Sequence, residues 1–241
     1  MSTLRRRLRN VYLAAGATSV LAATAGRRGD RLTRLAKPTL MPLLAASVAA
    51  DGAARRHPSV LAGLAGGWLG DVILMGKAGR SDDPAVRAKN LNKGSAAFAV
   101  NQVAYITELW KQGHRPRRST VALRLPVLLS GAGTAAVGAP SALPAAVGYG
   151  SALAATSVLA SDPEQLPKGA EPLDADLTGV GLGGNLFVLS DGLILARQAF
   201  LQGEQRLVRA LDGVVDGLVM ATYVAAQLLI VEALTGAGDD K

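Results

Sequence analysis

The stretch Gly66–Gly76, GGWLGDVILMG, places one aspartate, Asp71, in the middle of an apolar run. A second stretch, Asn185–Ala196 (NLFVLSDGLILA), repeats this arrangement around Asp191. An ionisable side chain within a long apolar helix is costly unless it faces other helices or a water-filled cavity. The two stretches therefore indicate helices that pack together inside a membrane, with both carboxylates directed into the bundle.

The composition of the whole chain agrees with a membrane protein. Of its 241 residues, 49% are hydrophobic and 18% are charged, and the charges occur in short blocks between apolar runs. Such blocks suit helices that are apolar all round and meet lipid or other helices. The net charge of +8 would also suit nucleic acid, but aromatic residues make up only 4% and the basic residues flank the apolar runs. Anchoring at a membrane surface explains that placement better, so no nucleic-acid partner is expected.

A spanning helix needs about 20 mostly apolar residues, and this length predicts eight transmembrane helices. Their expected bounds are 10–26, 38–54, 59–76, 91–110, 119–139, 140–160, 178–201 and 213–234. The links are short, apart from the polar segment 77–90 and the acidic, proline-rich segment 161–175, which is typical of a surface loop. We therefore expect an all-α membrane protein in which residues 1–241 form one integral membrane domain, with the lipid bilayer as its partner.

The N-terminus resembles a signal peptide, with a basic start, an apolar run and the small residues ATAG at 23–26. Because further spans follow, we expect an uncleaved first helix. With the N-terminus in the cytoplasm, Lys and Arg divide 13 to 13 between the two sides, so the positive-inside rule is tied. Four arginines ahead of the first span favour a cytoplasmic N-terminus. The abundance of Ala, Arg and Gly is typical of a GC-rich bacterial genome, which would place the protein in the plasma membrane.

No metal site or cofactor is expected. The chain has no cysteine, which excludes disulfides and thiolate metal sites. Its two histidines, His57 and His114, each lie beside Pro and Arg in connecting segments (ARRHPS and GHRPRR). We interpret both as solvated loop residues.

Two of the expected helices carry polar side chains along one face. Residues spaced i, i+4 and i+7 share a helix face, and both helices use this spacing. The residues are Asn101, Tyr105 and Glu108 in 91–110, with Gln102 beside them, and Asp216, Met220, Tyr223 and Gln227 in 213–234. Glycines near the aspartates would let neighbouring helices approach. With the two aspartates, the stripes predict a polar cavity in an apolar bundle.

Each polar residue also has a structural interpretation. The amides would join helices by hydrogen bonds, and the tyrosines would lie in the interface belts. The carboxylates near the span ends, Glu108 and Asp216, are interpreted as solvated. For Asp71 and Asp191 the alternative is a structural salt bridge, to Lys37 or to an arginine.

Five short segments cover the chain from the second expected span to the last. They are KPTLMPLL (37–44), GDVILM (70–75), GSAAFAVNQVAYI (94–106), LFVLSDGLILARQAF (186–200) and MATYVAAQLLI (220–230). In this order they resemble the YhhN-type lysoplasmalogenase family of multi-pass membrane enzymes. The chain departs from the family pattern at Gln102, where members commonly have a histidine. A proton transfer by that histidine would have no counterpart here.

The resemblance implies hydrolysis of the vinyl ether bond of a lysoplasmalogen, a lysophospholipid, to a fatty aldehyde and glycerophosphoethanolamine or glycerophosphocholine. Cleavage of an enol ether begins with slow protonation of the alkene carbon, and water then attacks the oxocarbenium ion. It therefore requires a proton donor and a nearby negative charge. Two carboxyl groups in one apolar site do not both ionise readily. We hypothesise that Asp71 and Asp191 are the catalytic pair, one as acid and the other as carboxylate.

Six further residues are expected to bind substrate or water. The tyrosines would hold or polarise the water or the ether oxygen, with the amides behind them as donors, and a lysine at the mouth of the second span would meet the lipid phosphate. These residues are Lys37, Gln102, Tyr105, Asn185, Tyr223 and Gln227.

Two other functions are compatible with buried carboxylates. A proton-coupled transporter would show a pseudo-symmetric repeat, and WLGDVILM (68–75) faintly echoes VLSDGLILA (188–196). A non-catalytic lipid-binding protein would tolerate Asp71→Asn and Asp191→Asn, whereas the enzyme would lose nearly all turnover.

Overall fold

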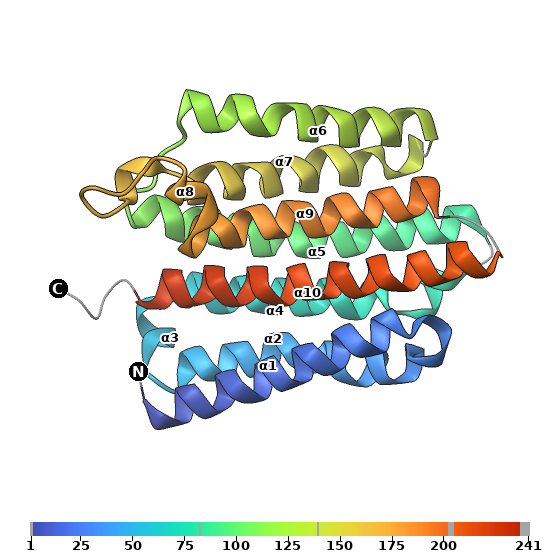
Figure 1. The fold of residues 1–241 in the computed structure, drawn as a ribbon, viewed down its shortest axis with the longest axis horizontal. Helices are drawn as coiled ribbons and strands as arrows, with labels where there is room; N and C mark the ends of the chain where they lie inside the picture. The colour runs from blue at the N-terminus through green and yellow to red at the C-terminus, as the bar shows by residue number, and fades with distance from the viewer. Residues whose placement is uncertain (1, 82, 139, 202–204, 237–241) are drawn as a thin grey trace.

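The structure, a computed structural model, describes residues 2–81, 83–138, 140–201 and 205–236 (Figure 1). Within these ranges the regular elements are helices, without strands. The α-helices are α1 Thr3–Thr24, α2 Asp30–Ala49, α3 Ala53–Arg56, α4 Pro58–Leu74, α5 Pro84–Lys111, α6 Arg118–Gly138, α7 Leu143–Ala160, α8 Asp174–Leu177, α9 Gly179–Phe200 and α10 Arg206–Gly236. The expectation of an all-α protein is confirmed.

Each expected span corresponds to one long helix, and α3 and α8 are short turns between them. Among the described residues, four segments are long and apolar enough to cross a membrane: Arg118–Val137, Pro140–Ala160, Gly179–Arg197 and Arg206–Gly236. Helix α4 is apolar but shorter. The chain is therefore a helical membrane protein, and eight crossings remain a prediction.

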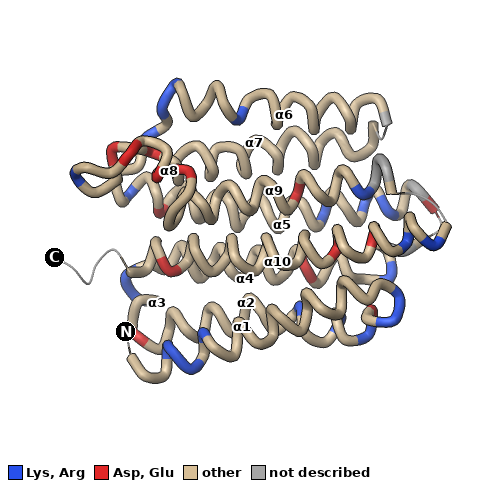
Figure 2. The backbone as a smooth tube through the Cα atoms, in the orientation of Figure 1, with Lys and Arg blue, Asp and Glu red and all other residues tan. Residues whose placement is uncertain are grey.

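The long helices lie side by side, and successive ones run in opposite directions (Figure 1). The start of α1 and the end of α10 lie at one end of the bundle, together with α3 and α8; we call this the terminal end. The links 25–29 and 75–81 lie at the opposite end. Lys and Arg gather at both ends, and the helix middles are largely free of them (Figure 2).

The core forms where α1, α2, α4, α5, α7, α9 and α10 meet. Its fully buried side chains include Tyr12, Leu40, Leu44, Tyr105 and Ile230. Helix α6 lies at the edge, packs mainly on α7 and exposes Leu123, Leu125, Val127 and Leu129. Exposed apolar faces of this kind are unfavourable in water and favourable in lipid. The outer surface thus agrees with the membrane assignment.

Glycine allows α4 and α5 to approach closely. A Cβ atom added at Gly66 would lie 2.9 Å from the carbonyl oxygen of Ala97, and one added at Gly70 would lie 2.5 Å from the Phe98 ring. Small residues at a helix interface permit such close backbone packing in membranes. This contact places Asp71 against α5.

The structure corrects the interpretation of both histidines as solvated. His114 is 8% exposed, and its Nδ1 lies 2.9 Å from the carbonyl oxygen of Leu159. His57 Nδ1 lies 2.6 Å from Oε1 of Glu108, which also accepts a hydrogen bond from Ser59. Glu108 is 3% exposed, so its interpretation as solvated is wrong too. Helix ends and turns that are distant in sequence cover these groups at the terminal end.

Candidate functional site

Asp71 lies in the last turn of α4 and is 1% exposed. The hydroxyl of Tyr223, on α10, donates a hydrogen bond of 2.8 Å to its Oδ2. The ammonium of Lys37, on α2, lies 3.0 Å from its Oδ1. A buried carboxylate needs such compensation to remain charged. Three helices therefore converge on a compensated carboxylate.

Lys37 is directed into the bundle. Its side chain is 22% exposed, and its Nζ lies 5.4 Å from the centroid of the Tyr223 ring as well as beside Asp71. The salt bridge considered as a structural alternative for Asp71 is thus present. The ammonium faces a carboxylate in the bundle, whereas the sequence placed it at the mouth of the site, facing a phosphate.

Asp191, on α9, is half-buried. Tyr149 on α7 lies next to it, and the Lys37 ammonium is close enough to act on its charge. Tyr149 in turn interacts electrostatically with both Asp71 and Asp191. The fold therefore brings the two aspartates, 120 residues apart in sequence, to one lysine and two tyrosines. We call Lys37, Asp71, Tyr149, Asp191 and Tyr223 the aspartate cluster.

Aromatic rings form the wall of the aspartate cluster. The Tyr223 ring meets Phe187 edge-on at 5.7 Å and Phe98 at 6.3 Å between centroids, and Phe98 lies 6.0 Å from Tyr149. The rings exclude water from one side of the carboxylates and offer an apolar surface to a ligand. Sequence reasoning missed Tyr149, Phe98 and Phe187. For Tyr149 a signal existed, since it is flanked by Gly148 and Gly150 within an expected span.

A second polar group lies behind the cluster, and we call it the amide group. The hydroxyl of Tyr105 donates a hydrogen bond of 2.5 Å to Oε1 of Gln227. Gln102 Nε2 donates to Oδ1 of Asn101, whose Nδ2 donates to the carbonyl oxygen of Gly63 on α4. Asn101 and Gln227 thus join helices, as the structural interpretation held, whereas Gln102 bonds to Asn101 on its own helix. Tyr105 and Tyr223 are buried, which contradicts their interpretation as belt residues.

Asn185 does not join either group. Its Oδ1 accepts hydrogen bonds from Arg124 at 2.6 Å and Ser157 at 2.7 Å, and its Nδ2 donates to Asp176. Arg124 and Asp176 also form an ion pair. Asn185 therefore ties α6, α7, α8 and α9 together near the terminal end, and its expected contact with substrate remains a prediction.

Asp216 is partly buried and paired, so its interpretation as solvated is wrong. Arg197, on α9, bonds to Asp216 and to Asp212 one turn earlier on α10. This pairing occurs because α9 and α10 are adjacent and antiparallel. Among the described residues, no group of three or more His, Asp or Glu side chains is arranged to hold a metal ion.

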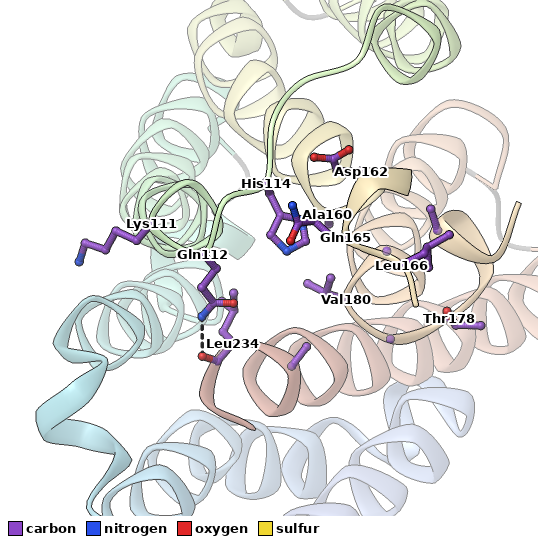
Figure 3. Close-up of a pocket in the computed structure, with 14 residues that line it drawn as sticks. Lys111, Gln112, His114, Ala160, Asp162, Gln165, Leu166, Thr178, Val180 and Leu234 are labelled. Atoms are coloured by element: carbon purple, nitrogen blue, oxygen red, sulfur yellow. Dashed lines mark hydrogen bonds between the residues drawn. The ribbon is translucent and has the colours of Figure 1, made fainter. Parts of the chain in front are cut away.

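A pocket of about 520 Å³ lies at the terminal end of the bundle (Figure 3). The ring of His114 points into it, and Lys111, Gln112 and Gln165 also line it. The carboxylate in its wall, Asp162, is already ion-paired with Arg117 at 3.0 Å. The pocket therefore lacks a pair of acids, and the aspartate cluster, near the other end of α4, is the better candidate site.

A family model described as the YhhN family matches residues 32–234. The match begins in α2, ends in α10 and includes every member of the aspartate cluster. No curated protein and no solved structure matches the chain.

Proposed function

The chain belongs to the YhhN family, and from that premise we propose that it is a lysoplasmalogenase that uses the aspartate cluster to hydrolyse the vinyl ether bond of a lysophospholipid. Family membership is consistent with a membrane hydrolase. The observation that carries the specific reaction is the pair of aspartates in unlike surroundings around Lys37. Such a pair supplies an acid and a negative charge at one place.

The surroundings of the two aspartates support different roles. Asp71 is held as a carboxylate by the Lys37 ammonium and the Tyr223 hydroxyl. Asp191 lacks a comparable ion pair among the described contacts, and its neighbour is the hydroxyl of Tyr149. We therefore assign Asp191 as the proton donor and Asp71 as the stabilising carboxylate.

The proposed reaction runs in two steps. The Asp191 carboxyl proton is transferred to the outer alkene carbon, which leaves an oxocarbenium ion next to the ether oxygen and close to the Asp71 charge. Water adds to the carbon bonded to that oxygen and gives a proton back to Asp191. The resulting hemiacetal collapses to a fatty aldehyde and the glycerol hydroxyl. One water is consumed, no net proton is used, and neither metal nor cofactor takes part.

The aromatic wall supports a lipid substrate. Phe98, Phe187 and the face of Tyr223 offer apolar surface beside the carboxylates, where an alkenyl chain could lie. Water exclusion there strengthens the interaction between Asp71 and a developing positive charge.

The experiment that tests this function is aldehyde release by the purified protein from an alkenyl lysophospholipid. The matched control is the lysophospholipid with a saturated ether, which has no alkene carbon to protonate. We expect aldehyde from the vinyl ether alone. Equal cleavage of both lipids, or cleavage of neither, would contradict the proposal.

A further inference from the structure

The interior holds two unpartnered amide atoms of opposite polarity. Gln102 on α5 and Gln227 on α10 are fully buried. Among the described residues, Oε1 of Gln102 and Nε2 of Gln227 have no hydrogen-bond partner. One atom is an acceptor and the other a donor. Exchanging O and N of the Gln227 amide would still leave one of its atoms unpartnered, because Tyr105 occupies only the other.

The two amides lie beside the same tyrosine. Gln102 precedes Tyr105 by three residues on α5, so their side chains are neighbours on one helix face. The Tyr105 hydroxyl donates a hydrogen bond to Gln227, and Asn101, the partner of Gln102, lies one turn before Tyr105 on α5. Both amides are therefore neighbours of Tyr105, whose hydroxyl oxygen can also accept a hydrogen bond.

We propose that Gln102, Gln227 and Tyr105 form a binding site for an internal water molecule, and that this site supplies the water consumed at the aspartate cluster. A water bound there donates to Oε1 of Gln102 and accepts from Nε2 of Gln227, with the Tyr105 hydroxyl as a third neighbour. Two to four polar partners are what buried waters have in proteins. A bridging water also removes the large penalty of leaving both amide atoms unpaired in an apolar core.

The site is close enough to feed the reaction. Gln227 follows Tyr223 by four residues on α10, about 6 Å along the helix axis. The Tyr223 hydroxyl binds Asp71 directly, and Tyr223 interacts electrostatically with Tyr105 and Tyr12. Tyr223 thus links Asp71 to the neighbouring turn of α10, which carries Gln227, and the rings of Phe98 and Phe187 pack against Tyr223. The supply role rests on the proposed hydrolysis; the water site itself does not.

The first test is a double-mutant cycle in thermal unfolding, with Gln102→Met, Gln227→Met and the double variant. Methionine keeps the length of glutamine and removes its amide. A shared water predicts that each single change lowers Tm by about 3–6 °C, and that the double variant loses less than the sum of the two single losses, because the shared water is removed only once. Additive losses, or single variants as stable as the parent, would overturn the water site.

The second test detects the water directly by radiolytic hydroxyl labelling and mass spectrometry. A bound water labels the buried Tyr105 ring in the parent protein and not in the double variant. Leu44, which is equally buried, serves as the unlabelled control. Absence of label on Tyr105 in the folded parent would overturn the site.

The third test concerns supply, and it uses the rate of aldehyde release. Each single methionine variant is expected to lower kcat at least tenfold with KM changed less than twofold, and Thr156→Val, a buried polar change on α7, is expected to leave both constants unchanged. An unchanged kcat in the glutamine variants would overturn the supply role. If the parent releases no aldehyde, the proposed function fails, and Tm and labelling still decide the water site.

Discussion

Lys37 determines the charge balance of the aspartate cluster. Its ammonium is 3.0 Å from Asp71 and also acts on Asp191, so it is the cation that both carboxylates share. Removing one partner of a buried ion pair leaves the other charge uncompensated, which is far more costly than removing both. The stability of the fold and the chemistry of the site therefore depend on the same side chain.

We expect Lys37→Met to lower the free energy of unfolding by about 2–3 kcal/mol, below the usual range for a fully buried pair because Lys37 is 22% exposed. Thermal unfolding of the purified protein measures the loss. The control is Lys37→Met combined with Asp71→Asn, which removes both charges and is expected to recover most of it. If the double variant were less stable than Lys37→Met alone, Lys37 would not stabilise the fold through its ion pair with Asp71.

Asp191→Asn is expected to lower kcat for vinyl ether cleavage by about 10²–10⁴-fold, because it removes the proposed acid. The folded state should be retained, since asparagine has nearly the same size and shape as aspartate. In the parent, slow proton transfer to carbon predicts a slower reaction in D₂O than in H₂O. Aldehyde release in the two solvents tests this, and equal rates would show that protonation is not rate-limiting.

At the scale of elements, the contact of α4 with α5 positions the site. Gly70 precedes Asp71, and a Cβ atom there would lie 2.5 Å from the Phe98 ring. That ring packs on Tyr223, which binds Asp71. If α4 moved away from α5, the Phe98 and Tyr223 rings would shift, and the position of the Asp71 carboxylate would change with them.

Gly70→Ala is expected to lower the free energy of unfolding by about 1–3 kcal/mol through overpacking, and to reduce kcat because the Phe98 ring must move. Gly133→Ala on α6 is the matched control, since a Cβ atom there meets nothing within 4 Å. The control should unfold at or slightly above the parent temperature, as alanine favours helix. Equal Tm values for both variants would contradict close packing at Gly70.

The apolar pattern predicted the existence and order of the long helices but not their ends. Helix α2 begins at Asp30 and contains Pro38, where the sequence predicted a first turn. Helices α5 and α10 begin at Pro84 and Arg206, seven residues before the expected spans. Predicting a span from about 20 apolar residues identifies only the apolar part of a helix. The helix itself continues for further turns that carry charged residues.

Helix periodicity found the buried polar stripes but could not place them relative to one another. Asn101 and Tyr105 share a face, as their spacing predicted. Asn185 lies six residues before Asp191, about 9 Å away along α9, and bonds instead to Arg124. Which helices face each other at a given depth depends on tertiary packing. Phe98 is apolar like its neighbours in the sequence, so no pattern of polar and apolar residues identified it as part of the site.

At the scale of the whole molecule, hydrogen bonds and ion pairs of buried polar groups stabilise the terminal end. Asp162 accepts a hydrogen bond of 2.8 Å from the backbone N–H of Arg115 and pairs with Arg117. Although burial raises the pKa of the Asp162 carboxyl, these hydrogen bonds and the Arg117 charge lower it overall. Burial lowers the pKa of His114, and its bond to Leu159 and the charge of Asp162 offset only part of that shift.

These two pKa shifts predict that acid loosens the terminal end first. Folding favours neutral His114, so its contribution is present above the ordinary histidine pKa of about 6.5 and declines as pH falls below it. Folding favours ionised Asp162, whose contribution is present above the ordinary aspartate value of about 4 and is lost as pH falls through the lowered pKa.

We expect hydrogen exchange in residues 112–117 and 161–178, corrected for the intrinsic pH dependence, to quicken between pH 7 and 5 and again below pH 4. The link 25–29 at the opposite end is the internal reference. In Asp162→Asn the second increase should be smaller, because one paired carboxylate has been removed; the part that remains comes from other paired carboxylates at this end, such as Asp176. Equal acceleration at both ends would mean that these groups do not govern the acid response.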